Sequence, residues 1–211
     1  MKQRCLGLDI SRYSTGWCIV DVNTEKQLKT YCEGMKIVQY GYLDTSSIKE
    51  EGSMLIYLEQ EFTNIIEQHK PTIIVAEQQF VGKNAQTGLV LAGIHAIMKL
   101  VAAKHKIDVI YYPILTMKST TLNGIKLKKD DGTRKTGLEI KQEVQQEVFN
   151  IFNNTKFINI TDDVTDAISA VITYVRLDGQ IIGKQSANYK NKPSKKHTIS
   201  NKRERKAKKD G

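Results

Sequence analysis

Cysteine and proline are scarce in this chain of 211 residues, which contains three of each. The three cysteines show no Cys-x-x-Cys spacing, so neither a disulfide framework nor a zinc site is indicated. A reduced, intracellular setting is the simpler expectation. No long apolar segment of the signal-peptide kind occurs in the first ten residues, and we find no apolar run of membrane-spanning length. These absences favour a soluble, cytoplasmic protein that does not contact a membrane.

The net charge of +9 is informative because of where it lies. Residues 184–211 contain eleven Lys or Arg and two acids, so residues 1–183 are formally neutral. We therefore expect one domain over 1–183. The tail over 184–211 has almost nothing to bury and should be disordered. Its charge suits DNA, RNA or another polyanion.

Apolar patterns indicate an α/β fold that begins with an antiparallel meander. Strands are predicted at 5–10 and 15–22, around a turn at 11–14, then at 27–33 and 36–43, and later at 72–76 and 108–112. Helices are predicted from a cap at Ser53 to Pro71, over 85–104, after a capping box of Thr136 and Glu139, and over 162–176 after Thr161.

The segment 118–135 differs from its neighbours in carrying six basic residues and two turn signals, Asn123-Gly124 and Asp131-Gly132. This composition predicts a mobile loop or ribbon. In the apolar helix 85–104, Gly93 would be useful if another helix must come close.

Acidic residues stand out in three distant segments. Asp9 interrupts an apolar strand, where a carboxylate is costly unless a cation or hydrogen bond meets it. Glu77 ends another predicted strand, and Asp163 and Asp166 fall on one face of the last helix. Carboxylate oxygens suit hard divalent cations, and a pair of such ions can stabilise the attacking and leaving oxygens of a phosphoryl transfer.

Each acid alone also has a structural explanation. Asp9 could be a satisfied acid at a turn, and Asp162, Asp163 and Asp166 could interact with the positive end of the helix dipole. Convergence of the three segments on one point is what favours a catalytic site.

Four blocks, in order, resemble the RuvC family of Holliday-junction resolvases, whose fold is of the RNase H type. They are LGLDISRYSTGWCIV, IIVAEQQF, NAQTGLVLAGIHAIM and DDVTDAISAVIT. The resemblance covers residues 5–176. It implies a mixed five-stranded sheet flanked by helices and a DNA endonuclease that cleaves branched, four-way junctions as a homodimer, using two Mg²⁺ or Mn²⁺ ions per active site.

The same resemblance implies roles for individual residues. The family's catalytic, metal-binding acids match Asp9, Glu77, Asp163 and Asp166, and its two lysines near the scissile phosphate match Lys118 and Lys141. An aromatic that contacts bases at the junction centre matches Phe80. Further DNA contacts are expected from the neighbouring basic residues, Lys83, Lys118, Lys126, Lys128, Lys129, Arg134 and Lys135.

Departures from the family leave other interpretations open. Ile10-Ser11 replaces a common Pro-Gly, and the extended basic loop and tail suggest a phage or mobile-element branch. A structure-tolerant nuclease, an RNA-processing nuclease of the same fold and a DNA-binding protein with vestigial acids remain alternatives. An ATPase or sugar kinase of the actin-like fold would normally need a second related domain, which we do not see in this chain.

Overall fold

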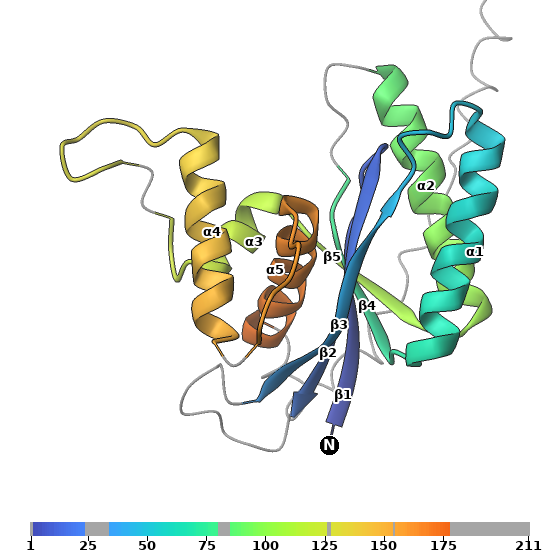
Figure 1. Ribbon diagram of the computed structural model, residues 1–211, viewed down its shortest axis with the longest axis horizontal. Coiled ribbons are helices and arrows are strands. Elements are labelled where there is room, and N and C mark those ends of the chain that lie inside the picture. The colour runs from blue at the N-terminus through green and yellow to red at the C-terminus, as the bar shows by residue number, and fades with distance from the viewer. Residues whose placement is uncertain (1, 24–33, 80–84, 126–127, 154, 178–211) are drawn as a thin grey trace, which may run out of the picture. The chain divides into compact units, whose positions relative to one another are not determined.

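Five strands form the centre of the molecule in our computed structural model, which describes residues 2–23, 34–79, 85–125, 128–153 and 155–177. The strands are β1 (Lys2–Asp9), β2 (Ser14–Asn23), β3 (Met35–Asp44), β4 (Ile73–Glu77) and β5 (Asp108–Tyr112), in the order β3-β2-β1-β4-β5 (Figure 1). The first three pair antiparallel, and β4 and β5 run parallel to β1. The expected mixed five-stranded sheet is therefore confirmed. The tail, its boundary at 183/184 and the segment 27–33 lie outside the described residues.

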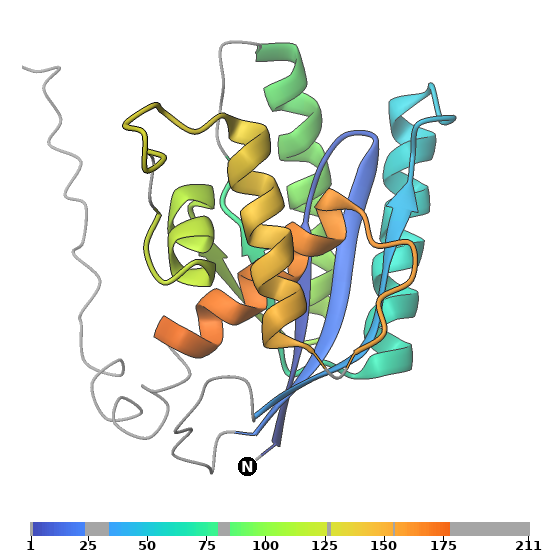
Figure 2. The ribbon, with the colours of Figure 1, turned by 60° about the vertical axis from the view of Figure 1, so that its left-hand side comes forward.

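Helices cover both faces of this sheet. Helices α1 (Glu51–His69) and α2 (Ala85–Lys104) lie on one face, whereas α3 (Ile114–Thr121), α4 (Gly137–Ile151) and α5 (Asp162–Leu177) lie on the other (Figures 1 and 2). Side chains alternate accordingly along β1, because Cys5 joins the cluster under α4 and α5 and Leu6 and Leu8 join the cluster under α1 and α2. Burial on both faces explains why residues 5–8 of β1 and residues 73–76 of β4 are continuously apolar.

Two helix starts show how local chemistry sets the boundaries. The Glu50 carboxylate accepts hydrogen bonds from the backbone N–H groups of Gly52 and Ser53, so α1 begins at Glu51 and the predicted cap at Ser53 was wrong. The capping box at the start of α4 is confirmed, with the Glu139 N–H donating to Thr136 Oγ1 at 3.2 Å and the Thr136 N–H donating to Glu139 Oε2 at 2.8 Å.

The basic segment 118–135 is only partly a loop, contrary to the sequence prediction. Its first residues belong to α3, where Met117 and Thr121 are buried. The Arg176 guanidinium of α5 donates to the carbonyl oxygens of Thr120 and Thr121 at the end of α3. Farther along, Lys128 forms an antiparallel bridge with Arg134, so a short ribbon does form there.

Helix α2 is long and apolar enough, by length and composition alone, to cross a membrane. The expectation that no segment has this character was wrong. Its packing is that of a core helix, because Ile94, Met98 and Val101 are buried in the cluster shared with the sheet and α1. A Cβ atom built on Gly93 would lie 3.7 Å from Leu55 Cδ2, so the close neighbour of Gly93 is α1.

Candidate active site

The sheet topology places two of the predicted acids side by side. Strands β1 and β4 are parallel neighbours whose last paired residues are Leu8 and Ala76. Asp9 and Glu77 are the next residues along each strand, so both carboxylates emerge at the same edge of the sheet. Both side chains are partly exposed, and they are hydrogen-bonded to each other.

Helix α5 brings the other two acids to this edge, and glycine makes its approach possible. A Cβ atom on Gly16 of β2 would lie 2.2 Å from the Asp163 carbonyl carbon and oxygen. A Cβ atom on Gly7 of β1 would lie 2.3 Å from the Ala167 carbonyl oxygen. Only a residue without Cβ allows this contact between helix backbone and sheet. The first turns of α5 therefore lie over the carboxyl end of β1 and the beginning of β2.

The carboxylates raise one another's pKa values. Burial is the largest cause of the raised pKa of Asp9, followed by the negative charges of Asp166, Glu77 and Asp163. Burial and the Asp166 charge likewise raise the pKa of Glu77. The hydrogen bond between them raises the pKa of Asp9 and opposes the rise for Glu77.

Both predicted lysines lie within electrostatic reach of these acids. Burial raises the pKa of Asp166, and the charges of Lys118 in α3 and Lys141 in α4 oppose that rise. Burial lowers the pKa of Lys141, but the acid charges, Asp162 first, outweigh it and raise the pKa overall. Lys141 Nζ lies 3.4 Å from Asp162 Oδ2. The structure thus brings together the six residues predicted as catalytic, which come from β1, β4, α3, α4 and α5.

The donor chemistry of this cluster fits a hard divalent cation. Its four predicted ligands are all carboxylates, and their mutual repulsion would be relieved by a positive ion. Among the described residues, no group of three or more Asp, Glu, His or Cys is already arranged to hold an ion. The hydrogen bond between Asp9 and Glu77 would have to open for both to act as ligands.

The predicted DNA-contacting residues divide into three groups. Phe80, Lys83 and Lys126 lie outside the described residues. Lys128 and Arg134 are exposed on the ribbon. The remaining three contact acids or lie near them. Lys118, in α3, lies near Glu77 and Asp166, and the other two are paired with α4, with Lys129 Nζ 2.6 Å from Glu139 Oε1 and Lys135 Nζ 2.5 Å from Glu143 Oε1.

Sequence reasoning missed the relation between Asp162 and Lys141. Asp162 was noted only as an acid in a first helical turn, where the helix dipole accounts for it without any partner. No local signal connects residue 141 with residue 162, because the pairing depends on how α4 packs against α5.

Taken together, the sheet order, the helix layers and the acid cluster define an RNase H-like nuclease. The model of the family "Crossover junction endodeoxyribonuclease RuvC" matches residues 5–174. The chain belongs to this family, a group of metal-dependent nucleases that hydrolyse DNA.

Relatives cover most of the chain. A RuvC protein of Caldicellulosiruptor saccharolyticus is 22% identical over 179 residues, which are 85% of this chain and 96% of the relative. One from Dictyoglomus thermophilum is 25% identical over 170 residues, covering 81% and 94%. Thermus thermophilus RuvC, solved in complex with a Holliday junction substrate, aligns with TM-score 0.64 and 14% identity over 85% of this chain and 98% of that one. The yeast mitochondrial Holliday junction resolvase aligns with TM-score 0.56 and 14% identity, covering 87% and 82%.

Proposed function

We propose that this protein is a metal-dependent endonuclease that resolves four-way DNA junctions by paired, symmetric nicks. The observation that carries the proposal is the meeting of Asp9, Glu77, Asp163 and Asp166 at the carboxyl ends of β1 and β4, beneath the start of α5. Membership of the crossover junction endodeoxyribonuclease family supports the choice of substrate.

In this proposal the four acids hold two Mg²⁺ or Mn²⁺ ions, which as Lewis acids would favour hydrolysis of the phosphodiester. Lys118 and Lys141 keep positive charge beside Glu77 and Asp166. That charge offsets the negative charge that builds up on the phosphate as it becomes five-coordinate. Asp162 orients Lys141 through their ion pair.

DNA is positioned by cations outside the acid cluster. The exposed Lys128 and Arg134 of the ribbon are the best placed for phosphate contacts, which hold DNA without reading its sequence. Phe80, Lys83 and Lys126 keep their predicted roles in DNA contact, and the tail is expected to add affinity for DNA, RNA or another polyanion. The bacterial relatives support the bacterial cytoplasm as the compartment, and a phage origin remains a prediction.

The outer face of α2 supports the expected homodimer. Leu89 and Leu100 are 71% and 49% exposed, and they lie three turns apart on the helix. Between and beyond them on the same stripe are the exposed small residues Ala92, Ala96 and Ala103. This spacing of apolar residues is typical of helices that pack against a second helix. Replacing Leu89 and Leu100 by Lys should convert a dimer to a monomer in analytical ultracentrifugation, and an unchanged mass would exclude this face.

Substitution of the acids tests the proposed site. Asp9→Asn and Asp166→Asn should lower the rate of junction cleavage on the order of a thousandfold, the upper range for removing one electrostatic element of an active site. Their affinity for junction DNA, measured by gel shift in EDTA, should remain near that of the parent. Asp108→Asn is a matched control, because Asp108 is exposed at the start of β5, whereas Asp9 and Glu77 lie at the carboxyl ends of their strands.

The rival functions give different results. If Asp9→Asn and Asp166→Asn cleave as well as the parent, the site assignment is wrong. A parent that binds junctions with no metal-dependent cleavage would be a DNA-binding protein, and preferential cleavage of structured RNA would indicate the RNA-processing alternative.

A further inference from the structure

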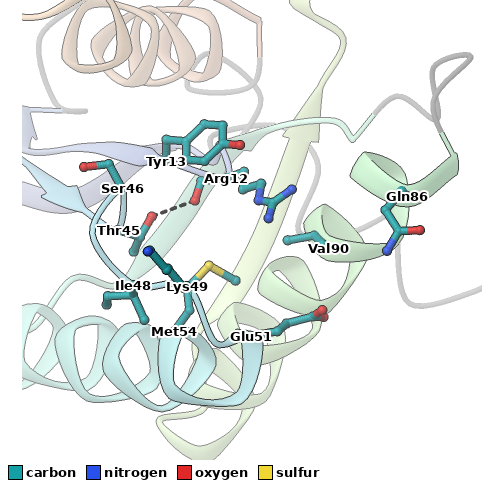
Figure 3. A pocket seen from close by; sticks show the side chains of 10 residues that line it. All are labelled: Arg12, Tyr13, Thr45, Ser46, Ile48, Lys49, Glu51, Met54, Gln86 and Val90. Carbon is teal, nitrogen blue, oxygen red and sulfur yellow. Dashed lines mark hydrogen bonds between the residues drawn. The ribbon is translucent and has the colours of Figure 1, made fainter.

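A pocket of about 260 Å³ lies between the turn that follows β1, the segment that follows β3 and the first turns of α1 and α2 (Figure 3). It is slightly smaller than the roughly 300–1,000 Å³ of pockets that hold drug-sized ligands, so its volume suits one small group rather than a stretch of duplex. None of the residues that line it belongs to the acid cluster or to the DNA contacts assigned above.

Hydrogen bonds within the turn and to Thr45, the residue after β3, hold the wall that the turn forms. Ser11 Oγ donates a hydrogen bond to the Ser14 carbonyl oxygen at 2.6 Å. The Thr45 N–H donates to the Tyr13 carbonyl oxygen at 2.9 Å, and Thr45 Oγ1 donates to the Arg12 carbonyl oxygen at 2.6 Å. Arg12 and Tyr13 follow Asp9 by three and four residues. These bonds fix the backbone positions from which both side chains extend.

The lining combines an apolar interior with a cationic rim. Met54 and Val90 are buried. Figure 3 shows the Arg12 side chain reaching from the turn toward α2, with Lys49 and Met54 on its α1 side and Val90 on its α2 side. The Tyr13 side chain is 59% exposed, and the Arg12 guanidinium carbon lies 5.3 Å from its ring centroid.

This combination suits a nucleotide that has left the base stack. Apolar side chains and an exposed aromatic ring bind the faces of a base, and lysine or arginine binds its phosphate. Neither Arg12 nor Lys49 has an ion pair with an acid in the described part of the chain. Glu51 is the one acid in the lining, and its carboxylate can accept a hydrogen bond from the amino group of a base.

We propose that this pocket binds one unstacked nucleotide of the substrate strand, close to the phosphate that is cleaved. The proposal rests on the proposed function, because it takes the DNA at the acid cluster to be the substrate. A base inside a duplex could not enter a pocket of this size, so the nucleotide must be extruded. A four-way junction, whose arms meet at an open centre, supplies such a nucleotide at low cost.

Binding of a short single strand tests the pocket independently of junction cleavage. The probe is a trinucleotide with a central 2-aminopurine, added to the full-length protein in EDTA and followed by fluorescence anisotropy. Tyr13→Ala should weaken binding about tenfold, equivalent to about 1.4 kcal/mol and within the range for one base stacked on an aromatic ring. Ser46→Trp, at an exposed position on the rim, should fill the pocket and abolish binding. Tyr42→Ala should bind like the parent, because Tyr42 is a similarly exposed tyrosine on β3 outside the pocket.

Three results would overturn the proposal: no binding by the parent, unchanged binding by Ser46→Trp, or equal affinity for an abasic trinucleotide. Junction cleavage by the same proteins distinguishes failure of the pocket from failure of the proposed function. A parent that cleaves no junction but binds the probe in a manner sensitive to Ser46→Trp would retain the pocket and refute the function. If the parent cleaves junctions but Ser46→Trp binds the probe as well as the parent does, the proposed function would be retained and the pocket would be refuted.

Discussion

At the scale of single residues, Asp9 shows how burial and neighbouring carboxylates disfavour the charged form of an acid in the cluster. The pKa values of Asp9, Glu77 and Asp166 are all raised, chiefly by burial. A raised pKa means that the folded state binds the proton more tightly than the unfolded chain does. That contribution to stability is complete below the unfolded pKa of about 4 and is lost as pH rises through the folded values. Without divalent ions, the cluster should therefore be stabilised in acid and destabilised at neutral pH.

Asp9→Asn should relieve this repulsion in the absence of metal. In EDTA at pH 8 the variant should melt higher than the parent, on the order of 3 °C for each 1 kcal/mol gained, and the difference should shrink toward pH 4. Thermal melts across that range measure it, with Asp108→Asn as the control. A variant that melts lower than the parent at pH 8 in EDTA would contradict the electrostatic description.

The ion pair between Lys141 and Asp162 leads to a prediction about pH. Because the Asp162 charge and hydrogen bond raise the pKa of Lys141, Asp162→Asn should let Lys141 lose its proton at lower pH. The alkaline limb of the single-turnover cleavage profile should then move to lower pH by less than about one unit, because an exposed ion pair is worth no more than about 1 kcal/mol. An unchanged profile would mean that Asp162 does not position the lysine, and Glu147→Gln, elsewhere on α4, should leave the profile unchanged.

Residue types revealed the acids but not all their partners. A carboxylate in an apolar strand is unusual enough to predict a site at Asp9, and the resemblance pointed to Lys118 and Lys141. The engagement of Lys129 and Lys135 by Glu139 and Glu143 could not be foreseen, because a basic residue in a loop has the same sequence signal whether or not an acid meets it.

At the scale of elements, the contact of α5 with the sheet is the critical one. Gly16→Ala would place a Cβ atom 2.2 Å from the Asp163 backbone, so α5 would have to shift and the acids with it. We expect a loss of stability of about 3 kcal/mol, in the range for overpacked cores, with a loss of cleavage. Gly137→Ala is the matched control, since a Cβ there meets nothing within 4 Å and alanine favours helix. Urea denaturation measures both, and a Gly16→Ala protein as stable as the parent would refute the close contact.

The ribbon and α4 give a second prediction at this scale. Glu139→Gln with Glu143→Gln would free Lys129 and Lys135 for DNA while removing two ion pairs at the surface, which contribute little to stability. The salt dependence of duplex binding should become steeper, by about 0.9 in the log–log slope for each additional phosphate that is neutralised. Fluorescence anisotropy titrations from low to high salt measure the slope. A slope equal to that of the parent would show that the freed lysines do not reach DNA.

Most elements followed from periodicity, and the exceptions have physical reasons. Helix α2 and strands β4 and β5 agree closely with the predicted ranges because they are apolar and clearly bounded. Helix α3 was missed because eight residues are too few to show a periodic pattern. The start of α1 was misplaced because glutamate is an uncommon cap, and Glu50 succeeds only because its carboxylate turns back to the first N–H groups.

At the scale of the whole molecule, the net charge has its own consequence. Residues 184–211 hold the entire excess of nine positive charges. If this tail touches phosphates, deleting it should weaken DNA binding and leave cleavage at saturating protein unchanged. The salt dependence should also flatten, by about 0.9 in the log–log slope for each phosphate that the tail neutralises in the full chain. Equal slopes for the full and shortened chains would assign the tail to another role.

The central claim concerns the substrate, and one measurement tests it most directly. A four-way junction and a linear duplex of matched sequence, each labelled in turn on every strand, are incubated with Mg²⁺, Mn²⁺ or EDTA, and the nicks are mapped. We predict paired nicks at symmetric positions in the junction, none in the duplex and none in EDTA. Nicks scattered over junction and duplex alike would contradict junction resolution and leave a structure-tolerant nuclease, and no metal-dependent nick in either would refute the nuclease itself.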